Sequence, residues 1–196
     1  MMIRSLLVSL ILSTALSGCL AIAAGGVAGT GYTVAQERSV GSVVDDNAIW
    51  TKIKSAFLQH DVNDLFGDVN VEVSEGRVLL TGDVRSPQTR VDAVRITWQV
   101  SGVKEVINEI QVTDQTTLKN YANDLWIITQ VKSRLLLEKN LRSINYSVDC
   151  INATVYLMGI AQDQNELNRA TIIAGKVKGV KNVISHVRLR QDPLRS

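Results

Sequence analysis

Apolar residues recur at helical spacing in two stretches of the chain, 78 positions apart. These lines are Ile49, Ile53 and Phe57 in the first stretch and Ile127, Val131 and Leu135 in the second. Side chains at i, i+4 and i+8 share one face of an α-helix, so each stretch predicts a helix with one buried line. Asp45, Asp46 and Asp124 precede these lines, and an aspartate can cap the start of a helix. We therefore expect helices that begin near these aspartates.

A β-hairpin pattern follows the first of these helices. Val69, Val71 and Val73 alternate with polar residues, and residues 78–81 form an apolar run that ends before a glycine. The Glu75-Gly76 pair between the two runs is suited to a tight turn. The sequence therefore predicts two antiparallel strands after the helix.

A second helix and a third strand complete the unit. Pro87 lies at a favoured helix start, and we expect the helix to bury Val91, Val94 and Trp98 before it stops at Gly102. The last strand is predicted at 106–112. In the second copy the corresponding elements are a helix at 124–139, strands near 146–150 and 154–158, a helix at 163–178 and a strand at 183–189.

The two copies are an internal repeat, which decides the fold prediction. Residues 51–58 match 129–136 at a shift of 78, whereas 78–82 match 155–159 and 102–107 match 179–184 at a shift of 77. A unit of about 70 residues is close to the lower limit for burying a core alone. We predict an α+β fold in which each copy has the order helix-strand-strand-helix-strand, with two helices on a three-stranded mixed sheet. We also expect the copies to pack on each other.

The N-terminus has the layout of a secretory signal peptide. Arg4 precedes an apolar run at 6–12 that is too short to remain as a spanning helix. Leu16-Ser17-Gly18-Cys19 resembles the bacterial lipobox, which implies removal of residues 1–18, acylation of Cys19 with fatty acids such as palmitate, and a membrane anchor. The resemblance also implies, from Leu20, sorting to the outer membrane. Residues 19–44, rich in Gly, Ala, Thr and Ser, are predicted to form a flexible tether.

Cysteine usage and charge exclude several classes of protein. With Cys19 acylated, Cys150 has no partner for an internal disulfide and is best explained as a small buried residue. His60 and His186 belong to no metal-binding motif, so no metal or other cofactor is expected. Without residues 1–18 the chain has 20 basic and 19 acidic side chains, a formal charge of +1. This balance does not indicate a nucleic-acid-binding protein.

The hairpin that ends at Gly82, followed by Gly102-Val103 and Val106, is similar to a BON domain, and the second copy repeats these positions at 159, 179–180 and 183. The resemblance places BON domains at 45–114 and 123–191, with a linker at 115–122 and a tail at 192–196. Dual BON-domain lipoproteins imply a non-enzymatic protein on the periplasmic side of the outer membrane. They also imply binding of anionic phospholipid, phosphatidylglycerol or cardiolipin, and support of outer-membrane integrity and envelope protein assembly.

The expected phospholipid site lies on the first helix of the second domain. Its residues are Trp126, Gln130, Ser133, Arg134 and Leu137, and Lys132, Lys139 and Arg142 are nearby basic candidates. Trp126 lies about 100° around the helix from the buried line, where an aromatic ring suits a bilayer interface. Two alternatives stay open: Trp126 could fill a seam between the domains, and the protein could be a periplasmic adaptor that contacts the outer-membrane assembly machinery or cell-wall enzymes.

Overall fold

The computed structural model describes residues 39–113 and 118–195. The predicted signal peptide at 1–18, Cys19 and most of the predicted tether lie outside these residues. The first domain contains α3 (Val40–His60), the short helical segment η2 (Val62–Gly67), β1 (Val69–Ser74), β2 (Arg77–Val84), α4 (Pro87–Trp98) and β3 (Glu105–Val112). The second contains α5 (Leu118–Leu137), η3 (Ser143–Asn145), β4 (Tyr146–Ile151), β5 (Thr154–Ala161), α6 (Gln164–Gly175), β6 (Asn182–Leu189) and η4 (Pro193–Arg195).

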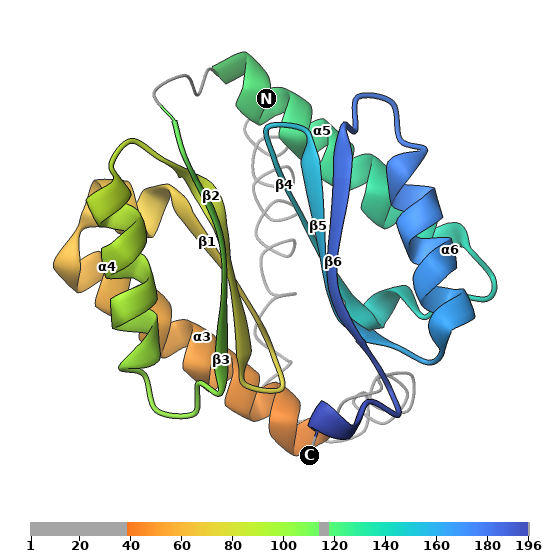
Figure 1. Cartoon of the computed structure of the whole chain (residues 1–196), viewed down its shortest axis with the longest axis horizontal. Helices are drawn as coiled ribbons and strands as arrows, with labels where there is room; N and C mark the ends of the chain where they lie inside the picture. The colour runs from red at the N-terminus through yellow and green to blue at the C-terminus, as the bar shows by residue number, and fades with distance from the viewer. Residues whose placement is uncertain (1–38, 114–117, 196) are drawn as a thin grey trace, which may run out of the picture. The chain divides into compact units, whose positions relative to one another are not determined.

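Each domain has one three-stranded mixed sheet, as predicted. The strand orders are β1-β2-β3 and β4-β5-β6, with the first pair of each sheet antiparallel and the second parallel. The parallel connection passes through α4 or α6, because parallel neighbours need a crossover. The helix-strand-strand-helix-strand order predicted from the repeat is therefore confirmed in both copies (Figure 1).

Glycines at equivalent positions allow close backbone approach inside each sheet. Gly82 and Gly159 have φ values of 138° and 137°. A Cβ at either position would collide with a backbone carbonyl oxygen, of Asp68 in the first domain and Asn145 in the second. Only glycine combines this backbone conformation with the available space.

The first helix of each domain begins earlier than predicted. Ser39 caps α3 by accepting a hydrogen bond from the backbone N–H of Ser42, and α5 begins at Leu118. Residues 40–44 of the predicted tether and 118–122 of the predicted linker are therefore helical, and Asp46 and Asp124 are not helix caps. The capping prediction was wrong because these carboxylates have other backbone partners.

Asp46 and Asp124 hold the hairpin turns. The two carboxylate oxygens of Asp46 each accept a backbone N–H at 2.8 Å, from Glu75 and Gly76. Asp124 accepts those of Asn152 and Ala153 at 2.8 and 2.9 Å. All four turn residues have positive φ, as in a two-residue type I′ turn. Each aspartate thus joins the first helix of its domain to the hairpin.

The core of each domain lies between its helices and one face of its sheet. Ile53, Phe57, Ile127 and Val131 are fully buried, which confirms the helical lines seen in the sequence. The prediction for α4 was wrong in its rotation. Ala93, Ile96 and Thr97 are buried, whereas Val91 and Trp98 are exposed and Val94 packs at the core margin. Small Ala93 lets α4 approach the sheet closely, and Ala170 is buried similarly in α6.

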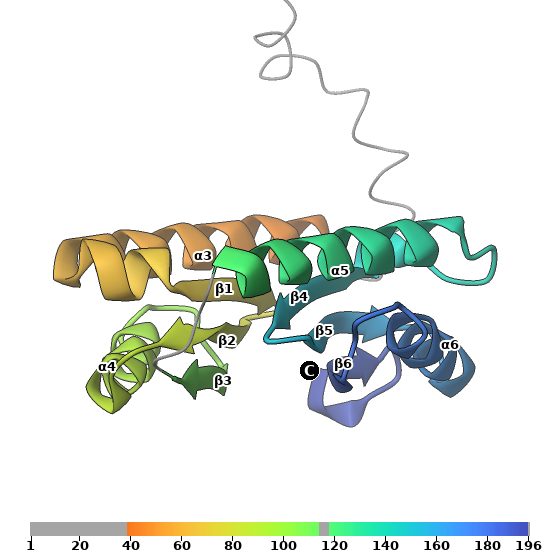
Figure 2. The same ribbon diagram turned by 90° about the horizontal axis from the view of Figure 1, so that it is seen from above.

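The two sheets pack on each other through the faces that carry no helix. Leu79 of β2 meets Tyr156 and Met158 of β5 in a separate apolar cluster, flanked by Ile107, Ile151 and Ile184. The expected packing of the copies is therefore confirmed. Figures 1 and 2 show the sheets between α4 and α6. Within the described residues, no helix combines the length and apolarity needed to cross a membrane.

Candidate functional site

The core fixes the rotation of α5 and thereby exposes the predicted lipid site. Because Ile127, Val131 and Leu135 face the core, residues about 100° away point outward. Trp126 is 45% exposed and Leu137 is 80% exposed. Ser133 and Arg134 are also exposed, and Gln130 is half-buried. We call these five residues the Trp126 face.

The Trp126 face continues onto the end of α6. The Arg134 guanidinium donates a hydrogen bond to the backbone carbonyl of Lys176 at 3.2 Å, which joins α5 to the residue after α6. Lys176, Lys178 and Ile172 are exposed near this end of α6. This contact brings Arg134 of the Trp126 face close to exposed residues at the end of α6.

A groove between the two domains lies on the other flank of α5. It has a volume of about 520 Å³, and its helical walls come from Trp50 and Lys54 of α3 and from Tyr121, Leu125, Ile128 and Lys132 of α5. Trp126 lies on the opposite flank of α5 from these residues. The geometry favours the exposed position for Trp126 over the seam position, and it places Lys132 in the groove, away from the Trp126 face.

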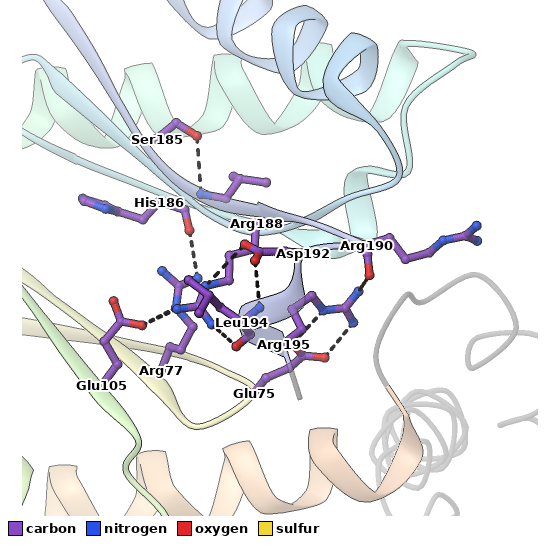
Figure 3. Close-up of polar contacts among 11 residues, drawn as sticks. Glu75, Arg77, Glu105, Ser185, His186, Arg188, Arg190, Asp192, Leu194 and Arg195 are labelled. Carbon is purple, nitrogen blue, oxygen red and sulfur yellow. Dashed lines mark hydrogen bonds and ion pairs between the residues drawn. The ribbon is translucent and has the colours of Figure 1, made fainter.

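An arginine network crosses the seam between the sheets (Figure 3). Arg77 is only 7% exposed and donates to the Glu105 carboxylate at 2.8 Å and to the His186 carbonyl at 3.0 Å. Arg188 donates to the same Glu105 oxygen at 2.7 Å. One carboxylate of the first domain is therefore shared by an arginine from each domain.

The predicted tail also contacts the first domain. Arg195 in η4 forms a bidentate pair with the Glu75 carboxylate, with distances of 2.7 and 2.9 Å. His186 Nε2 lies 2.9 Å from the Glu109 carboxylate. The segment at 192–195 thus extends the contact between the two domains along the seam.

A second polar cluster lies at the opposite end of the seam. The buried Asp149 carboxylate accepts hydrogen bonds from Thr81 and from Asn70 of the first domain. Asn152 donates to Asp83 and Gln111 across the same interface. Sequence reasoning missed both clusters. Their signal in the sequence is the polar residues that alternate with apolar ones on β2 and β6. These polar residues lie on the sheet face away from the helices.

The structure buries Cys150 in the core of the second domain. Cys150 is 2% exposed, and burial, followed by the nearby Asp124 carboxylate, raises the pKa of its thiol far above the usual value. This confirms that Cys150 is a buried structural residue. Among residues 39–113 and 118–195, no group of three His, Cys, Asp or Glu side chains could hold a metal ion.

The two domains carry opposite charges. Residues 45–114 contain seven Lys and Arg against twelve Asp and Glu, a formal charge of −5. Residues 123–191 contain ten Lys and Arg against five Asp and Glu, a formal charge of +5. The near-neutral total therefore hides a polarised molecule, a signal that was already present in the sequence.

Comparison with known proteins identifies the repeat. The family profile of the BON domain matches residues 45–114 and 123–191. The chain is 50% identical over 78% of its length to an Anaplasma centrale protein described only as an uncharacterized protein in the gshII 5′ region, and this alignment covers 99% of that protein. It is 32% identical to the outer membrane lipoprotein DolP of Haemophilus influenzae, over 86% of this chain and 87% of DolP.

The osmotically-inducible protein Y of Escherichia coli is a further relative. It is 33% identical over 74% of this chain and 73% of its own length. Proteins of the DolP and osmotically-inducible kind are non-enzymatic, which confirms the prediction that the chain is not an enzyme.

Proposed function

Because the chain belongs to the BON-domain family and is DolP-like, we propose that it is a lipid-anchored outer-membrane protein whose second domain binds anionic phospholipid through the Trp126 face. In this proposal the protein faces the periplasm and supports outer-membrane integrity and envelope protein assembly. Its ligand is phosphatidylglycerol or cardiolipin, and its action is binding alone.

The anchor in this proposal is the acylated Cys19. The sequence before Cys19 has the order of a lipoprotein signal peptide, and a relative of similar length is named an outer membrane lipoprotein. Acyl chains would hold the protein at the bilayer, so a further contact needs only modest affinity. Tethering raises the local concentration of the second domain at the membrane surface.

The exposure of Trp126 and Leu137 is the observation that carries the lipid-binding proposal. These residues are eleven positions apart on α5, which corresponds to about 16 Å along a helix. Each would place apolar area in the interfacial layer of a bilayer, where an aromatic ring with a polar N–H is favoured. A helix that lies along the surface can insert both side chains together.

Charge attraction also favours an orientation in which the second domain faces the bilayer. Arg134 belongs to the Trp126 face, and Lys176 and Lys178 are exposed close to the contact of Arg134 with the end of α6. Each basic residue near an anionic surface contributes on the order of 1 kcal/mol. The charge of −5 on the first domain is repelled by the same surface. An anionic bilayer therefore orients the molecule with its second domain toward the lipid and its first domain away.

Vesicle binding of matched tryptophan variants tests this proposal. We would compare Trp126→Glu with Trp98→Glu, because Trp98 is 51% exposed on the other domain. The chain from residue 20 onward would be sedimented with phosphatidylglycerol vesicles and with uncharged phosphatidylcholine vesicles. We expect Trp126→Glu to abolish binding to the anionic vesicles, Trp98→Glu to retain it, and both to melt within a few degrees of the unmodified chain.

Added salt distinguishes the electrostatic contribution to vesicle binding from the apolar contribution. Charge attraction is screened over about 8 Å at physiological ionic strength, so binding should weaken as salt rises. Equal binding of the two variants, or equal binding to charged and uncharged vesicles, would contradict the proposal.

A further inference from the structure

The two edge strands that border the interdomain groove are protected differently. On β1, the indole N–H of Trp50 donates to the Val71 carbonyl at 3.1 Å, and the Lys54 ammonium donates to the Val69 carbonyl at 3.2 Å. Side chains of α3 thus occupy the outward-facing acceptors of this edge. Such protection prevents an edge strand from pairing with another chain.

The equivalent position on β4 lacks this cap, whereas the backbone N–H groups of Tyr146 and Cys150 on the same strand already donate to the Ser143 carbonyl and the Asp149 carboxylate. Val148 corresponds to Val71 in the repeat, and Ile128 corresponds to Trp50. Isoleucine has no hydrogen-bond donor in its side chain, so it cannot replace the indole. Among the described residues, no side chain supplies a hydrogen bond to the outward backbone groups of Val148.

The hairpin register directs those groups away from β5. Ile151 pairs with Thr154 across the two-residue turn, and such a flanking pair exchanges hydrogen bonds within the hairpin. Asp149 and Ser147 follow the same alternation, so Val148 points its N–H and C=O outward. Val148 is 3% exposed and lines the groove. Backbone groups that are buried in this way usually have a partner.

We propose that the groove binds an extended, basic segment of a partner protein, which pairs its backbone with the outward N–H and C=O of Val148 on β4. Apolar side chains of the segment would contact Trp50, Leu125 and Ile128. This is recognition by strand addition, in which main-chain hydrogen bonds supply affinity and side-chain pockets supply specificity. The groove lies apart from the Trp126 face. Binding of a partner segment in the groove would therefore give the protein an adaptor role that does not depend on lipid binding.

The preference for a basic segment follows from the charges around the groove. Its lining contains five carboxylates, Asp68, Glu72, Asp83, Asp124 and Asp149, against the ammonium groups of Lys54 and Lys132. Lys54 is already engaged by the carbonyls of Phe66 and Val69. Burial, and then the like charges of Asp64 and Asp83, raise the pKa of Asp68. A cationic side chain would relieve this repulsion.

A designed peptide with defined backbone edges tests strand addition. The probe is the capped heptapeptide Lys-Val-Lys-Val-Lys-Val-Lys, titrated without lipid into the isotope-labelled chain from residue 20 onward. Two analogues carry N-methyl groups, on the three valines in one and on the two inner lysines in the other. Because alternate residues of a strand use opposite edges, we expect one analogue to lose at least tenfold in affinity and the other to bind like the parent. The Val148 amide should shift on binding.

A tryptophan placed at the repeat position of Trp50 locates the site. Ile128→Trp introduces the cap found in the first domain, and we expect it to weaken peptide binding at least tenfold. Ile172→Trp makes the same change at an exposed position of α6 outside the groove, so it is the matched control and should not weaken binding. Equal affinities of the two methylated analogues, no shift of the Val148 amide, or undiminished binding to a folded Ile128→Trp variant would overturn the proposal. None of these results depends on the vesicle experiment.

Discussion

The first helices of the two domains share their buried faces and differ in their exposed ones. The exposed positions Trp126, Arg134 and Leu137 on α5 correspond to Ala48, Ala56 and Gln59 on α3. The buried lines and the turn-binding aspartates have matching roles in both helices. Core packing and turn geometry thus constrain the inward positions, whereas the outward positions are free to acquire different functions.

The largest predicted effect concerns a feature that the two domains share. Gly82→Ala and Gly159→Ala would each force a Cβ against a backbone carbonyl at positive φ. We expect each substitution to lower the free energy of unfolding by about 3 kcal/mol or more. Urea denaturation followed by circular dichroism measures this loss. A tolerated alanine at one position would show that the domains are less alike than their backbones indicate.

Removal of the aspartates that hold the hairpin turns should have the next largest effect. Asp46→Ala and Asp124→Ala each leave two turn N–H groups without their carboxylate partner. Hydrogen bonds to charged groups contribute about 1.5–3 kcal/mol each, and water recovers part of this at the turn. We expect each variant to lose about 2 kcal/mol by urea denaturation. Variants as stable as the parent would contradict a stabilising role for these turn contacts.

Loss of the shared carboxylate should weaken the contact between domains. Glu105→Gln removes the charge that pairs with both Arg77 and Arg188. Arg77 is buried and loses its only paired carboxylate among the described residues, so we expect a loss of about 1–2 kcal/mol. The control Asp92→Asn removes an exposed pair within α4 and should change the stability little. Equal effects of the two substitutions would contradict a stabilising role for the seam.

The smallest predicted effect is the pH dependence of Asp68. Its pKa is raised above the ordinary value of 3.8, so ionisation disfavours the folded state. The penalty is absent below the unfolded pKa and is complete once the pH exceeds the folded pKa. Asp68→Asn should therefore stabilise the chain at pH 7 by no more than about 0.5 kcal/mol, because the side chain is largely exposed and screened. Thermal melts at pH 7 and pH 3 test this, with no gain expected at pH 3.

The sequence predicted the fold because the repeat and the hydrophobic spacing report on buried contacts. The order of helices and strands along the chain follows from the repeat, and the buried lines of α3 and α5 follow from the hydrophobic spacing. The rotation of α4 did not, because the larger Val91 and Trp98 suggest a buried line more strongly than Ala93 does, although small residues permit close packing. The cap assignment of Asp46 and Asp124 failed for a related reason. Their partners are turn residues almost 30 positions away, which no local rule specifies.

The exposure of the Trp126 face could be predicted in part from the sequence. The 100° step from Ile127 to Trp126 places the tryptophan outside the core of its own domain. The choice between solvent and seam needed the relative placement of the domains, which depends on polar pairs such as Arg77 with Glu105. Residues as far apart in the sequence as Asn70 and Asp149 meet only in the folded chain. The uncapped Val148 on β4 is likewise recognised only by comparison with the capped Val71 on β1.

The most direct test of the central claim uses the indole N–H signals of the three tryptophans. Trp50 lies in the groove, Trp98 on the acidic domain and Trp126 on the proposed lipid-binding face. The isotope-labelled chain would be mixed with phosphatidylglycerol micelles that contain a spin-labelled lipid. The account predicts strong paramagnetic broadening of the Trp126 signal, with the Trp98 signal almost unchanged. Broadening of Trp98 to the same extent, or no broadening of Trp126, would contradict the claim that the second domain contacts the membrane through this face.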